Sequence, residues 1–222
     1  MQTERDALLE AALSHVPFEG MNDRALVAGA RDIGMTEAMA RVHFPQGGAG
    51  LAAAYHRRAD QQLRDWLART PPEGRFRDRV AEAVWHRLSL VQPDLVRAGA
   101  AVLALPQNAG LAARLVWETA DMIWTGLGDT SDDVNWYSKR ATLSAVISAS
   151  ALFWLGDASD DGAETRAFID RRIDGVMRIE GAKARLKKLP GAQAVTDLAF
   201  GWIRAPRPRD LPGRTRPGHD NK

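Results

Sequence analysis

Apolar residues recur at intervals of three and four along most of this chain, a spacing typical of helices that bury one face. No alternating run of Val, Ile and Thr bounded by turn residues indicates a strand. We therefore expect an all-α fold. The pattern predicts helices at about residues 3–15, 22–33, 36–43, 50–69, 75–91, 93–105, 108–126, 132–155 and 163–179.

The first fifty residues have the pattern of a helix-turn-helix motif. Pro17 is expected to break the first helix, Asn22 to cap the second, and Gly34 to turn the chain into a short helix that begins at Thr36. One hypothesis is therefore a regulator that reads DNA as a dimer. However, residues 21–50 hold three Arg against three acidic residues, and a neutral motif binds phosphate weakly.

The helix expected near residues 132–155 is the least polar of the chain. Between Ala141 and Leu155 no side chain is charged, and small residues alternate with large ones, which is typical of a helix surrounded by other helices. This run is shorter than the roughly 18 residues that a bilayer crossing needs. We therefore expect a packed helix here, with no transmembrane span.

Asn135, Trp136 and Tyr137 stand in the first turn of this helix, where the two rings either pack inside or face a partner. The run DVNWYSKRATLSA, followed by a long apolar helix, resembles the ubiquinone (coenzyme Q) biosynthesis lipid-binding accessory proteins. Those proteins have the fold of the tetracycline-repressor (TetR) family. The core NWY-x-[KR]-R carries the resemblance, which extends from about residue 8 to 189.

The resemblance implies a TetR-like fold, in which a helix-turn-helix that has lost DNA recognition precedes a helical bundle with a lipid pocket. It implies binding of an isoprenoid quinone precursor or phospholipid, which is presented to a ring hydroxylase of the ubiquinone pathway. That hydroxylase is a di-iron enzyme in mitochondria, whereas bacteria also use flavin enzymes, so its class stays open. Asn135, Trp136 and Tyr137 match the family's patch for this partner.

The bulkiest apolar side chains gather between residues 75 and 126. Large side chains interleaved with Ala and Gly either fill a core or leave an elongated pocket. We predict that an isoprenoid binds among the helices carrying these side chains: Trp85, Leu88, Leu103, Leu115, Met122 and Ile123.

Charge is distributed unevenly over the chain, whose net charge is only +2. From residue 181 onward ten basic residues face three acidic ones, and residues 191–203 have an amphipathic pattern. Such a helix, with an interfacial Trp and flanking Arg, either lies flat on an anionic bilayer or packs back onto the body. We expect the membrane contacts to come from Val195, Leu198, Trp202, Ile203 and Arg204.

These patterns predict four regions. They are a degenerate helix-turn-helix (1–49), a lipid-binding helical bundle (50–180), a hinge with an amphipathic membrane-binding helix (181–204), and a disordered basic tail (205–222).

The sequence carries no motif for catalysis or metal binding. There is no cysteine, no G-x-S-x-G elbow and no Gly-rich loop after a strand. His86 follows Glu82 by four residues, whereas di-iron bundles use Glu-x-x-His. Residues 129–140 resemble half a calcium loop, but Val134 and Arg140 occupy the positions of its Gly and its bidentate Glu. We expect no catalytic residue, no metal and no cofactor.

We therefore expect a non-catalytic, homodimeric lipid-binding protein that works at a membrane surface without binding specific DNA. The alternative is a TetR-type transcriptional regulator with a hydrophobic ligand pocket. The first residues show neither an apolar signal core nor an Arg- and Ser-rich transit segment. This pattern favours a cytoplasmic protein, peripheral on a bacterial inner membrane, or an already processed form in the mitochondrial matrix.

Overall fold

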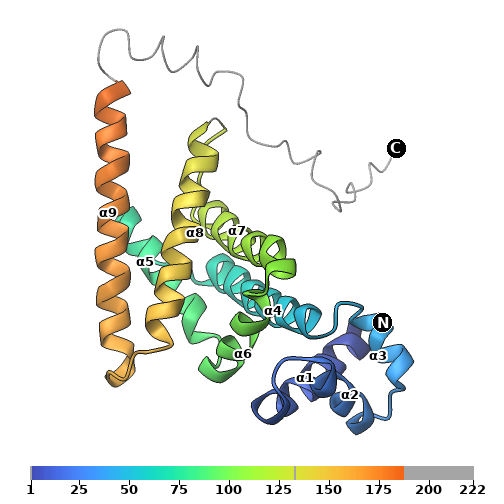
Figure 1. Ribbon diagram of the computed structural model, residues 1–222. Coiled ribbons are helices and arrows are strands. Elements are labelled where there is room, and N and C mark those ends of the chain that lie inside the picture. Colours follow the sequence, from blue (N-terminus) through green and yellow to red (C-terminus); the bar gives the residue numbers. More distant parts are fainter. Residues whose placement is uncertain (1, 133, 188–222) are drawn as a thin grey trace, which may run out of the picture.

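The computed structural model describes residues 2–132 and 134–187, and every regular element in these ranges is helical (Figure 1). The all-α expectation is confirmed. The helices are α1 (Gln2–Glu19), α2 (Asp23–Asp32), α3 (Glu37–His43), α4 (Gly47–Arg69), α5 (Phe76–Ser89), α6 (Pro93–Leu103), α7 (Ala109–Gly126), α8 (Val134–Trp154) and α9 (Ala163–Lys187). Short 3-10 turns, η1 (Pro106–Asn108) and η2 (Asp160–Gly162), precede α7 and α9.

Helices α1 to α3 lie together at one end of the molecule, in blue in Figure 1, and include the expected helix-turn-helix. The Asn22 side chain caps α2 by accepting from the backbone N–H groups of Arg24 (2.8 Å) and Ala25 (3.3 Å). Thr36 caps α3 by accepting from the Met39 N–H at 3.3 Å. Gly34 turns the chain between them with a φ of 68°, in the left-handed region that favours glycine.

The first helix is longer than we predicted. It runs through Pro17 to Glu19 and ends at Gly20, which has a φ of 76° and donates to the Val16 carbonyl at 2.9 Å. Pro17 removes one helical hydrogen bond, to the carbonyl of Leu13, but it lies in the last turn, and the buried face from Leu8 to Val16 holds the helix in place.

Helix α4 connects this end to the bundle, where it packs on α5, α6 and α7, while α8 packs on α7 and α9. Two apolar clusters form the core of the part of the chain that the structure describes. One lies around Leu8, Leu26 and Leu51, and the other joins Leu63 and Ile123 to α9. The core therefore holds the helix-turn-helix and the bundle in a fixed arrangement.

Helix α9 also differs from our expectation, because it continues across Gly181 to Lys187. A glycine inside a helix costs only about 1 kcal/mol, so it does not force the hinge that we placed there. Val195, Leu198, Trp202, Ile203 and Arg204 lie outside the described residues. Among the described helices, none is long and apolar enough to cross a membrane.

Candidate functional site

A cavity of about 180 Å³ lies between α4, α5, α6, α7 and α8. Its walls are largely aliphatic. They include Leu88, Val91, Val96, Leu103, Val116 and Ile147. Five polar side chains also line it, namely Tyr55 and His56 from α4, Arg87 from α5, Thr119 from α7 and Ser148 from α8. The cavity thus has a largely apolar surface, with His56, Arg87 and Thr119 together forming its main hydrogen-bonding end.

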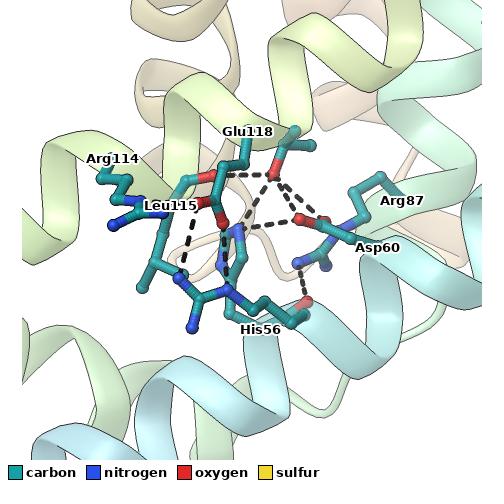
Figure 2. Close-up of polar contacts among 8 residues, drawn as sticks. His56, Asp60, Arg87, Arg114, Leu115 and Glu118 are labelled. Atoms are coloured by element: carbon teal, nitrogen blue, oxygen red, sulfur yellow. Dashed lines mark hydrogen bonds and ion pairs between the residues drawn. The ribbon is translucent and has the colours of Figure 1, made fainter. Parts of the chain in front are cut away.

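The polar end is built around the buried carboxylate of Asp60 (Figure 2). It accepts from Arg87 Nε at 2.6 Å and from the Thr119 hydroxyl at 3.0 Å. The Thr119 oxygen lies 2.8 Å from His56 Nε2, and Arg87 Nη2 donates to the His56 carbonyl at 3.0 Å. These four side chains form one network in which the buried Asp60 and Arg87 charges are paired.

Burial is the main cause that lowers the pKa of His56 to about 4, against the raising effect of the nearby Asp60 charge. The imidazole is therefore neutral at physiological pH. The Thr119 hydroxyl lies within hydrogen-bonding distance of Asp60, of the Leu115 carbonyl (3.2 Å) and of His56 Nε2, so the tautomer of His56 sets the direction of the last of these bonds.

The structure separates the six residues that we predicted for a lipid pocket. Leu88 and Leu103 line the cavity. Leu115 and Ile123 are buried in the core, at 1% and 0% exposed. Met122 lines a groove between α4 and α7, because neighbouring residues of a helix point about 100° apart.

Trp85 lies elsewhere, beside η2 and under the guanidinium of Arg166. Whether these six residues contact a lipid stays a prediction.

The predicted partner patch is an aromatic cluster where α7 meets α8. The ring centroids of Trp136 and Tyr137 lie 4.8 Å apart, and the Trp117 ring lies 5.9 Å from Trp136 and 6.4 Å from Tyr137. Asn135 and all three aromatic residues are partly buried. Trp117 was not among our predicted patch residues. In the sequence, Trp117 does not differ from the other large apolar residues of α7. Its place in the cluster follows only from the packing of α7 on α8.

A network of charged side chains around the buried Arg140 lies next to this cluster. Arg140, 2% exposed, donates to Asp121 at 2.6 Å and to Asp129 at 3.1 Å. Lys139 also donates to Asp129 at 2.7 Å. Burial acts to raise the pKa of Asp129, but hydrogen bonds from Lys139, Ser131 and Arg140 outweigh it and hold that pKa below its ordinary value.

Sequence reasoning missed the polar end of the cavity. His56 and Asp60 stand at i and i+4 on α4, one position after the apolar residues Tyr55 and Ala59. This spacing puts both polar side chains on one helix face, beside the buried stripe. It was the available signal, whereas the pairing with Arg87, 27 residues away, follows only from tertiary structure.

The arrangement defines an all-α protein with a TetR-type fold and an internal cavity. A crystal structure of a TetR transcriptional regulator from Nitrosomonas europaea is similar to it, with a TM-score of 0.63 and 18% identity. The match covers 78% of this chain and 97% of that one. At this identity the similarity concerns the fold alone.

The COQ9 family model matches residues 109–180, which include the aromatic cluster. The ubiquinone biosynthesis protein COQ9, mitochondrial, of Drosophila melanogaster is 31% identical over 79% of this chain and 56% of its own length. The protein of that name from Schizosaccharomyces pombe is 32% identical over 75% of this chain and 67% of its own. The human one is 29% identical, and the match spans 63% of it. The chain belongs to the COQ9 family.

Proposed function

We propose that this protein is a non-catalytic accessory protein of ubiquinone biosynthesis that binds an isoprenoid quinone precursor and presents it to a ring hydroxylase. Membership of the COQ9 family and the apolar cavity between α4 and α8 support this proposal. The cavity is smaller than the roughly 300–1,000 Å³ of ordinary ligand pockets, so a long isoprenoid tail extends beyond it. The cavity is the observation that carries the proposal.

Lipid that co-purifies with the native protein tests this function. Ala100 lines the cavity, whereas the neighbouring Ala101 does not. Mass spectrometry should find a quinone-pathway lipid on the wild type and on Ala101→Phe, and much less on Ala100→Phe. Equal lipid on both variants, or no such lipid on the wild type, contradicts the proposal.

We propose that the cluster of Trp117, Trp136 and Tyr137 is the surface that contacts the hydroxylase. Partly buried aromatic rings at one edge of a bundle are typical interface anchors. Trp136→Ala should therefore abolish pull-down of the pathway hydroxylase. Phe18→Ala is a matched control, because Phe18 is an aromatic residue that is 88% exposed in α1, and it should leave pull-down intact. Retained binding by Trp136→Ala removes the cluster from the interface.

We also propose that residues 191–204 attach the protein to an anionic membrane, on the strength of their amphipathic sequence and of the basic residues that flank them. The chain cut after Pro190 and the Trp202→Glu variant should both float less with anionic vesicles than the full chain. The protein would then lie on the surface of a membrane, either a bacterial inner membrane or, as in the names of the relatives, one in mitochondria. Equal flotation of all three forms contradicts the attachment.

A homodimer is part of the proposal. Helix α8 exposes Leu152 (71%) together with Ala145 and Ser148 on one uncharged face, which a second copy can cover. Light scattering should report a dimer for the wild type and a monomer for Leu152→Glu. A wild-type monomer contradicts it.

A further inference from the structure

The cavity has the size of a single ring. An engineered cavity of about 150 Å³ in another protein binds benzene, and the cavity here measures about 180 Å³. It therefore accommodates a six-membered ring with small substituents but no long chain. Val96, Leu103 and Ala151 around it are partly exposed, so a ring inside can carry a substituent that leaves between α6 and α8.

The polar end of the cavity offers a hydrogen-bond donor. Arg87 uses Nε for Asp60 and Nη2 for the His56 carbonyl. Its third nitrogen, Nη1, has no acceptor within the part of the chain that the structure describes. Arg87 as a whole is only 6% exposed, and Nη1 is the nitrogen of its guanidinium that stays available to a ligand or to water. An oxygen on a bound ring is a suitable acceptor for it.

The charges at this end cancel. Arg87 is paired with Asp60 at 2.6 Å, His56 is neutral and Thr119 carries no charge. Because Asp60 already neutralises Arg87, a ligand carboxylate would give this end a net negative charge in a largely apolar cavity, which is costly. A hydroxyl or carbonyl oxygen adds a hydrogen bond without adding charge.

We propose that the Arg87, Asp60, His56 and Thr119 network is a specificity element that selects an uncharged ring oxygen and rejects a ring carboxylate. The ring lies between the aliphatic walls, with its oxygen at Arg87 and its remaining substituent toward α6 and α8. This deepens the proposed function, on which it rests, by assigning the ring and not the isoprenoid tail to the cavity.

Three ring probes of similar size test the selection on the full chain at neutral pH, by calorimetry and by ligand NMR. They are p-cresol, toluene and 4-methylbenzoate. We expect p-cresol to bind at least about tenfold more tightly than toluene, since its oxygen gains a bond to a charged donor. 4-Methylbenzoate should bind more weakly than both. Equal binding of p-cresol and toluene, or preferred binding of 4-methylbenzoate, overturns the proposal.

Two variants locate the site. Ala100→Phe should abolish p-cresol binding while Ala101→Phe preserves it, with circular dichroism confirming that both fold. His56→Gln should reduce the ratio of p-cresol to toluene affinity without abolishing toluene binding. Unchanged p-cresol binding in Ala100→Phe overturns the assignment to this cavity. If p-cresol is selected but no pathway lipid co-purifies, the specificity stands and the proposed function fails.

Discussion

The guanidinium of Arg140 lies 4.0 Å from the centroid of the Trp136 ring, while its nitrogens bond to Asp121 and Asp129. One buried cation therefore connects α7, the loop after it and the aromatic cluster. Arg140, which contacts the Trp136 ring, is itself only 2% exposed. The orientation of the proposed docking surface thus depends on charges inside the protein.

Replacing Arg140 should destabilise the fold strongly. Arg140→Leu leaves the buried carboxylate of Asp129 with one cation fewer, and breaking a buried pair costs about 3–5 kcal/mol. Arg114→Leu is the control, because Arg114 is exposed and its pair with Glu118 contributes about 0–1 kcal/mol. Urea denaturation measures both. Similar losses for the two variants would mean that Arg140 is not structurally special.

Periodicity predicted much of this fold because local signals and tertiary packing agree. The caps at Asn22 and Thr36 and the first-turn Pro93 are local, so they marked helix starts correctly. Pro17 and Gly181 led us to end two helices too early. A helix whose faces are packed tolerates one unfavourable residue.

The candidate sites depend on contacts between segments far apart in sequence. Trp136 and Tyr137 were visible as a pair, but Trp117 joins them only because α7 packs on α8. Similarly, His56 and Thr119 are 63 residues apart and meet in the fold. A sequence pattern assigns a face to a residue without identifying the residue opposite it.

Asp60 and Arg87 should show strong energetic coupling. Each single replacement, Asp60→Leu or Arg87→Met, leaves one buried charge unpaired and should cost about 3–5 kcal/mol. The double variant should cost less than the sum by more than about 1 kcal/mol. The exposed pair of Arg97 and Asp94 gives the control cycle, with coupling of about 0–1 kcal/mol. Additive effects in the buried pair would contradict the network.

Protonation of His56 should lower the free energy of unfolding in mild acid. Its pKa is about 4 in the native protein and about 6.5 when unfolded, so only the unfolded state takes up this proton as the pH falls between those values. The contribution is complete above pH of about 6.5, and about 3 kcal/mol is lost by pH of about 4. Denaturation at stepwise pH should show a shallower decline for His56→Gln. Parallel pH profiles for both proteins would refute the assignment.

DNA recognition by the helix-turn-helix should be absent. Helix α3 exposes the apolar side chains of Met39 (49%) and Val42 (73%), and residues 21–50 carry equal numbers of acidic and Arg residues. Such a surface releases few counterions from DNA, so duplex affinity should be weak and nearly independent of salt. A titration of labelled duplex in about 50 mM salt, where phosphate contacts are favoured, measures this.

A gain-of-charge variant makes the same experiment decisive. In Met39→Lys with Val42→Lys, each lysine that reaches a phosphate should steepen the plot of log affinity against log salt by about 0.9. The double variant should therefore bind any duplex more tightly at low salt, with a steeper slope than the wild type and no preference for sequence. Replacement by Gln at both positions controls for the loss of apolar surface and should leave the slope unchanged. Sequence-selective wild-type binding tighter than micromolar would instead support the transcriptional regulator.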